Sequence, residues 1–239
     1  MSHDDLRPRG AGWFLRGVVG IAGELMITLG AVLALFVAWQ LLWTDVVADT
    51  EQSTVVSELE EEFRLGPTVV DPTTAPTVPA ADLGDAFAII RIPRFGADYA
   101  RPLYEGTDRH TLQQGIGHYA ETAGPGEVGN FSMAGHRTTY GKPFSRIAEL
   151  RDGDLVIVET RDSYFVYKVY DHAIVLPTQT EVILPVPGEP GEKPTEALLT
   201  MTSCHPQFSS RERYITHARL IDTLSREDGL PADLLNVEG

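Results

Sequence analysis

Residues 197–221 read ALLTMTSCHPQFSSRERYITHARLI and contain two strand-like runs joined by a polar segment. The runs at 197–204 and 214–221 are rich in apolar and β-branched residues, a composition typical of strands. If they pair as an antiparallel hairpin, Cys204 and Arg213 face each other at one end of it. This stretch therefore predicts a β-structure that brings a thiol and a guanidinium together.

Four further segments have a strand-like composition, rich in Val, Ile, Tyr and Phe and bounded by Gly, Pro or Asp. They read AFAIIRI (86–92), NFSMAGH (130–136), DLVIVET (154–160) and YFVYKVYDHAIVL (164–176). The helical signals among them, at 110–115 and 143–150, are short. Short strands at close spacing with few helices predict a mainly β domain over residues 86–224, folded as a closed or nearly closed barrel.

The charge of the chain is unevenly distributed. Its 239 residues carry 34 acids and 19 bases, a net charge of −15. Residues 44–85 hold ten acids and one base, whereas residues 86–224 hold 17 acids and 14 bases. The domain lacks the basic face that nucleic-acid binding requires, so nucleic acid is excluded as a partner. A single cysteine excludes an internal disulfide framework and a Cys-rich zinc or iron–sulfur site.

The N-terminal region contains an uncharged run at residues 25–43, LMITLGAVLALFVAWQLLW. As a helix it spans roughly 28 Å, close to the hydrocarbon core of a bilayer. We therefore expect a transmembrane helix over residues 17–43. The three arginines within residues 1–16 predict a cytoplasmic N-terminus and an extracellular remainder, hence a single-pass protein of the cell membrane. A cleaved signal peptide is disfavoured, because the run is long and no small-residue cleavage site follows it.

Residues 44–85 are expected to form an acidic and Pro-rich extracellular linker. Its first part, 48–65, has Val55, Leu59 and Phe63 at helical spacing and can form a short helix. The four prolines of the second part, set among small and polar residues, predict an extended and flexible stalk.

Three side chains are candidates for chemistry. Cys204 ends a strand-like run and precedes a loop, so it would be held in place yet accessible. The guanidinium of Arg213 beside it would favour the thiolate or bind a developing oxyanion. His136 also follows a strand-like run and can relay protons near neutral pH. The alternatives are a buried core cysteine and a merely structural histidine. His205 is a rival, but adjacent residues of a strand point to opposite faces, so it would point away from Cys204.

Several local sequences resemble those of a known family. They are GIGHY (115–119), AGHRTTYG (134–141), LLTMTSCHP (198–206) and Arg213, nine residues beyond the cysteine. Together they resemble the sortases of Gram-positive bacteria, and class E of actinobacteria most. The resemblance implies an eight-stranded sortase-type β-barrel with short helices, preceded by one transmembrane helix and a flexible stalk. Ser203 departs from the usual pattern, which has threonine directly before the cysteine.

The resemblance also implies an activity. The chain would be a cysteine transpeptidase that cleaves a C-terminal sorting signal, LAxTG- or LPxTG-like, between Thr and Gly. Cys204 would form a thioacyl intermediate, His136 would act as general acid and then base, and Arg213 would bind the substrate backbone or the oxyanion. The substrate-binding residues would be Tyr119, Thr202 and Ser203. The partners would be secreted proteins bearing the signal and an amine, either a lipid-linked peptidoglycan precursor or a pilin lysine. No cofactor or metal is implied.

Other functions remain open from the residues alone. A membrane-anchored cysteine protease would use the same side chains and let water complete the reaction. A non-catalytic cell-surface scaffold would not need Cys204. A metal-binding module is disfavoured, because adjacent Cys204 and His205 are poorly spaced for one tetrahedral site. The tail at 225–239 is either disordered or docked on the barrel through its leucines.

Overall fold

The computed structural model describes residues 11–65 and 81–235 and divides the chain into two compact units, Met1–Trp43 and Thr44–Gly239. Helix α1 (Ala11–Arg64) contributes to both units. Most of the proline-rich part of the expected stalk and the last four residues of the tail lie outside the described residues.

The first unit contains the apolar half of α1. Within it, Arg16–Val37 is a 22-residue stretch that is long and apolar enough to cross a membrane. Its large apolar side chains, such as those of Leu25, Ile27 and Leu35, are more than half exposed. Such exposure is unfavourable in water and favourable in lipid. The helix therefore fits the single-pass membrane anchor that the sequence predicts.

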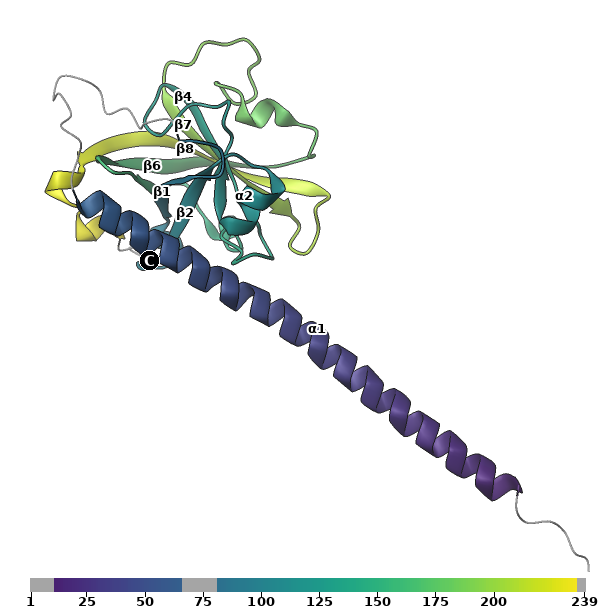
Figure 1. Cartoon of the computed structure of the whole chain (residues 1–239). Helices are drawn as coiled ribbons and strands as arrows, with labels where there is room; N and C mark the ends of the chain where they lie inside the picture. The colour runs from purple at the N-terminus through teal and green to yellow at the C-terminus, as the bar shows by residue number, and fades with distance from the viewer. Residues whose placement is uncertain (1–10, 66–80, 236–239) are drawn as a thin grey trace, which may run out of the picture. The chain divides into compact units, whose positions relative to one another are not determined.

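The second unit contains eight strands, among the residues described, that close into a barrel in the order β1-β2-β3-β4-β7-β8-β6-β5 (Figure 1). The strands are β1 (Ala86–Arg91), β2 (Ala100–Glu105), β3 (Ile116–His118), β4 (Gly129–Ala134), β5 (Leu155–Glu159), β6 (Ser163–Val175), β7 (Ala197–His205) and β8 (Glu212–Ser225). Neighbours are antiparallel except β2 with β3 and β4 with β7. Apolar side chains such as those of Phe131, Met133, Leu199 and Met201 fill the interior. The expected eight-stranded barrel is confirmed.

Two of the eight strands, β2 and β3, were not predicted from the sequence. Strand β2 reads ARPLYE, in which a proline and two charged residues obscure the alternation, and β3 is three residues long. The helical signal at 110–115 is confirmed by α2 (Arg109–Gln114), which begins after Asp108. The Asp108 carboxylate accepts hydrogen bonds from the first free backbone N–H groups of that helix. The signal at 143–150 yields only a short 3₁₀ turn, Ile147–Glu149.

The membrane-distal half of α1 is the first part of the expected linker. Residues 44–64 continue the helix, and Val56, Leu59 and Phe63 pack against Ile89 of β1. The helix predicted from the spacing within 48–65 is therefore confirmed, and the structure adds that this part of the linker is packed on the barrel. The physical reason is the apolar stripe, which is buried on the barrel and offsets the repulsion among the acidic residues around it.

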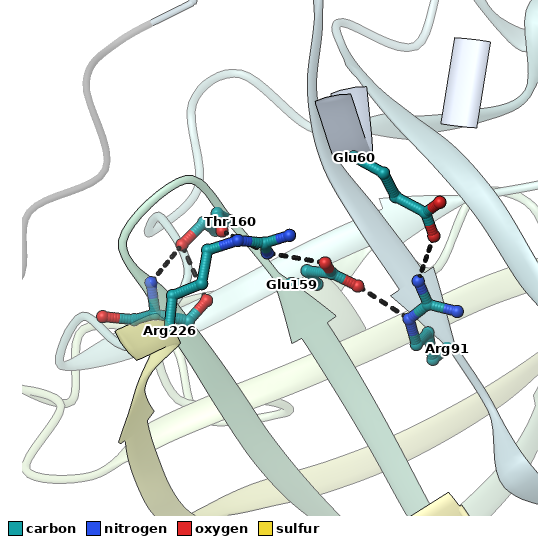
Figure 2. Close-up of polar contacts among 6 residues, drawn as sticks. Glu60, Arg91, Glu159, Thr160 and Arg226 are labelled. Carbon is teal, nitrogen blue, oxygen red and sulfur yellow. Dashed lines mark hydrogen bonds and ion pairs between the residues drawn. The ribbon is translucent and has the colours of Figure 1, made fainter. Parts of the chain in front are cut away.

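A chain of charged side chains centred on a buried glutamate joins this helix to the barrel and to the C-terminal region (Figure 2). Glu159 of β5 is 2% exposed and accepts hydrogen bonds from Arg91 at 2.7 Å and from Arg226 at 2.6 Å. Arg91 also donates to Glu60 of α1 at 2.6 Å. The guanidinium of Arg226 lies 5.0 Å from the centre of the Phe63 ring. The Glu159 carboxylate thus binds two arginines, Arg91 from the first strand of the barrel and Arg226 from the turn that follows the last strand.

The C-terminal region docks on the barrel as far as it is described. Leu230, Leu234 and Leu235 pack against a buried cluster that includes Ile157 and Tyr164. Of the two possibilities left open by the sequence, docking is therefore correct for residues 225–235.

Candidate active site

The outer face of strands β4 and β7, opposite to the barrel core, is polar and covered. Along β4 and β7, the residues that alternate with the core positions are Asn130, Ser132, Thr200 and Thr202, each at most 5% exposed. The segment between β6 and β7 covers them, since the Asn130 amide donates to the carbonyls of Val182 at 3.2 Å and Leu184 at 2.9 Å. This polar face continues along β7 towards Cys204.

Cys204 lies where the polar face opens. Its side chain is partly exposed, and in the β7–β8 ladder it pairs directly with Arg213. Directly opposed residues of antiparallel strands share a face, with Cβ atoms about 5 Å apart. Arg213 donates to the carbonyls of Ser210 at 3.0 Å and Glu212 at 2.9 Å, which orders the turn that follows the cysteine. The antiparallel hairpin predicted from the sequence is confirmed, with Cys204 directly opposite Arg213 in its ladder.

His136 lies at the same end of the barrel, two residues beyond the end of the neighbouring strand β4. Ala134 of β4 pairs in parallel with Thr202 of β7, and the backbone N–H of Gly135 continues that ladder by donating to the Thr202 carbonyl at 3.2 Å. His136 and Cys204 therefore each follow a paired residue by two positions, in the same direction. Burial lowers the pKa of His136. The structure brings the three residues predicted from the sequence to one end of three adjacent strands.

The predicted substrate-binding residues separate into two groups. The hydroxyl of Tyr119 lies 3.0 Å from that of Thr202, so these two side chains meet on the polar face next to Cys204. Ser203 alternates with them, is 3% exposed, and donates to the Gly135 carbonyl at 2.8 Å. Direct contact between Ser203 and a substrate is therefore not favoured. The Ser203 hydroxyl instead joins the segment that leads to His136 to the strand that carries Cys204.

Arg137 is a residue of the site that sequence reasoning missed. It is 8% exposed and donates to the carbonyl of Cys204 at 3.1 Å. The same nitrogen lies 3.0 Å from Nδ1 of His205, and the guanidinium lies 5.7 Å from the centre of the Tyr214 ring. Arg137 therefore ties the segment of His136 to the backbone of the cysteine. The only sequence signal for Arg137 was its position directly after His136. That signal is weak, because an arginine is usually exposed to solvent.

Comparison with known proteins decides the family. A model of the Sortase domain matches residues 90–221, more than half of the chain. This chain belongs to the sortase family. Sortase SrtE1 of Streptomyces coelicolor is 36% identical over 225 residues, which cover 90% of this chain and 60% of that protein. This sortase thus spans about three fifths of the length of that relative.

Solved structures of sortases share the fold. Sortase E from Streptomyces avermitilis is 40% identical, with a TM-score of 0.59 over 65% of this chain and 100% of that one. Sortase E1 from Streptomyces coelicolor, solved with a tripeptide in its active site, is 37% identical, with a TM-score of 0.57 over 63% of this chain and 98% of that one. The predicted resemblance to sortases, and to their class E, is confirmed.

Two histidines, the half-buried His136 and the buried His217, should make the stability of this sortase depend on pH. Burial lowers the pKa of both His136 and His217. In the unfolded chain they titrate near 6.5, so as the pH falls through that value the unfolded state takes up protons that the folded state does not. The free energy of unfolding is then expected to fall as the pH drops from 7 towards the lowered folded-state values, by at most about 1.4 kcal/mol per pH unit for each histidine.

Urea unfolding of the detergent-solubilised chain at pH 7, 6 and 5 measures this slope. His217→Asn retains a side-chain N–H for the Thr200 hydroxyl, which lies 2.9 Å from Nδ1 of His217, and should make the slope shallower. His110→Asn, at an exposed position, is the control. An unchanged slope in His217→Asn would contradict the prediction.

Proposed function

We propose that this sortase is a membrane-anchored cysteine transpeptidase that acts on LAxTG- or LPxTG-like sorting signals. One observation carries the proposal: Cys204 and Arg213 are direct cross-strand partners at the open end of a polar face, beside the strand end that bears His136. A nucleophile, an oxyanion donor and a proton carrier at one place suit acyl transfer.

In the first step, the thiolate of Cys204 attacks the Thr–Gly carbonyl of the signal. Arg213 binds the developing oxyanion or the adjacent substrate backbone. His136 donates its proton to the glycine amine, which leaves as the C–N bond breaks, and a thioester remains on Cys204. Because burial lowers the pKa of His136, its cationic form gives up this proton readily.

In the second step, an amine attacks the thioester. Neutral His136 accepts the proton of the incoming amine, a new amide bond forms, and the sulfur of Cys204 is released. The acceptor is a lipid-linked peptidoglycan precursor or a pilin lysine. Because the thioester conserves the energy of the cleaved amide, the transfer needs no other energy source.

Substrate binding is assigned to the polar face next to the cysteine. The tripeptide in the active site of the related sortase E1 supports a peptide ligand here. Tyr119 and Thr202, whose hydroxyls meet at 3.0 Å, are proposed to contact the residues of the signal that precede the cleaved bond. Ser203 is proposed to hold the strands rather than the peptide.

The apolar part of α1 supports the proposed location. A 22-residue span that is apolar enough to cross a membrane, with arginines at its start and before it, favours a cytoplasmic N-terminus and a catalytic domain outside the cell. Substrates and acceptors that share the same bilayer would then be concentrated near the enzyme.

Mass spectrometry of the detergent-solubilised chain with an LAxTG peptide tests the function. We expect an acyl adduct on Cys204 that disappears when triglycine is added, with the transpeptidation product formed in equal amount. A peptide with the same residues in scrambled order is the control. Hydrolysis alone, whatever amine is offered, would make the chain a cysteine protease, and no adduct at all would favour a scaffold.

A further inference from the structure

Gln52 lies on the membrane-distal half of α1 and contacts the segment that carries His136. It is 1% exposed, and its Nε2 donates to the backbone carbonyl of Tyr140 at 3.0 Å. The next residue, Gly141, has φ +69°, and a Cβ atom there would lie 2.8 Å from the same nitrogen. The helix and this loop therefore meet at a distance that leaves no room for another side chain.

Tyr140 connects this contact to the histidine. Its ring centre lies 5.1 Å from that of the His136 ring. Its backbone has φ 54°, a conformation that is unfavourable for a residue with a side chain and that persists where contacts hold it. Two contacts do so here: Gln52 binds the carbonyl, and Gln113 of α2 donates to the hydroxyl at 3.1 Å.

A second set of contacts fixes the helix beside this loop. Asp49 of α1 pairs with Arg101 of β2 at 2.9 Å, and the Arg101 guanidinium lies 5.4 Å from the centre of the Tyr99 ring. The Tyr99 hydroxyl in turn donates to the Pro143 carbonyl at 2.6 Å, in the same loop as Tyr140. The helix therefore contacts the loop after His136 directly through Gln52 and is linked to it a second time through Arg101 and Tyr99.

The presence of a glutamine at this buried position is not explained by stability alone. Its Oε1 is buried and has no hydrogen-bond partner among the residues described. An unsatisfied buried oxygen lowers stability, whereas an apolar side chain of the same length would avoid that loss. The feature that such a side chain could not supply is the N–H that holds the Tyr140 carbonyl.

We propose that Gln52 is a positioning residue for His136 and acts through Tyr140. The membrane-distal half of α1 is then part of the catalytic domain rather than a passive connection to the anchor. This inference deepens the proposed function and rests on it, because it assigns the helix a role in orienting the proton carrier of the transfer reaction.

Gln52→Met, in the full chain in lipid nanodiscs, removes the N–H and keeps the length. We expect kcat for transpeptidation to fall about tenfold, the effect of losing one hydrogen bond, with KM changed less than twofold. The unfolding midpoint should stay unchanged or rise. Glu60→Gln is the matched control on the same helix: it weakens the pair with Arg91, so it should lower the midpoint and leave kcat unchanged.

A double-mutant cycle shows the route of the effect. Tyr140→Ala removes the ring that contacts His136, so Gln52→Met should have little further effect on kcat in that background. If the two losses simply add, or if Glu60→Gln lowers kcat as much as Gln52→Met does, the proposal is wrong.

A measurement without substrate separates this proposal from the function it deepens. The Cε1–H proton resonance of His136 should shift in Gln52→Met and remain unchanged in Glu60→Gln. If that shift is found but wild type forms no thioester, the proposed function fails and the positioning contact stands. If wild type forms the thioester and the resonance is unchanged, Gln52 does not position His136.

Discussion

Replacing Cys204 with alanine is expected to abolish the acyl adduct and to lower transpeptidation at least about 1000-fold, because the variant has no nucleophile. The chain has one cysteine, so no second thiol can take its place. Its partly exposed position at a strand end means that the loss should not disturb the core. The rate of product formation with an LAxTG peptide and triglycine measures the effect.

Binding of the peptide should survive this change. Tyr119 and Thr202 remain in place, so the Kd of the peptide for Cys204→Ala should stay within about threefold of wild type. Gln207→Ala, an exposed position three residues away, should keep full activity. Normal function of Cys204→Ala would show that the chain is a scaffold and not an enzyme.

Replacing Glu159 with alanine should reduce the free energy of unfolding by about 3 kcal/mol. The change leaves Arg91 and Arg226 without their shared carboxylate, in positions where their side chains are 16% and 18% exposed. Removing one partner of a buried ion pair costs roughly 3–5 kcal/mol, and the lower end applies because Arg91 keeps Glu60 and Arg226 keeps the Thr160 carbonyl. Urea unfolding of the detergent-solubilised chain at pH 7 gives the value.

Glu149→Ala is the matched control for Glu159→Ala. Glu149 pairs with Arg146 at 2.7 Å, but both side chains are about half exposed. Water screens such a pair, so the loss should be below about 1 kcal/mol. Equal losses in the two variants would show that the buried network does not stabilise the contact between α1, β1 and the C-terminal region.

Local patterns were sufficient for much of the fold and the site. The β7–β8 hairpin joins residues that are close in sequence, so its pairing of Cys204 with Arg213 follows from the strand-like runs and the short segment between them. The helical spacing of Leu59 and Phe63 similarly predicts the apolar face that α1 buries. In each case the information lies within one element or two adjacent ones.

Contacts between distant segments were not predictable in this way. The parallel pairing of β4 with β7 brings the strand ends that precede His136 and Cys204 together, although 68 positions separate the two residues along the chain. No local signal shows which polar residue Arg137 will meet, or that Gln52 will reach Tyr140, because an isolated arginine or glutamine is normally solvated.

The sequence by itself determined the apolar helix that is long enough to cross a membrane, most of the strands and the three candidate catalytic residues, because hydrophobic periodicity and cross-strand pairing act over short distances. The tertiary structure decided that Ser203 holds strands together, that residues 44–64 belong to the domain, and that Arg137 and Gln52 support the site. Those outcomes depend on burial between elements far apart in the chain, and burial is a property of the closed barrel rather than of any one segment.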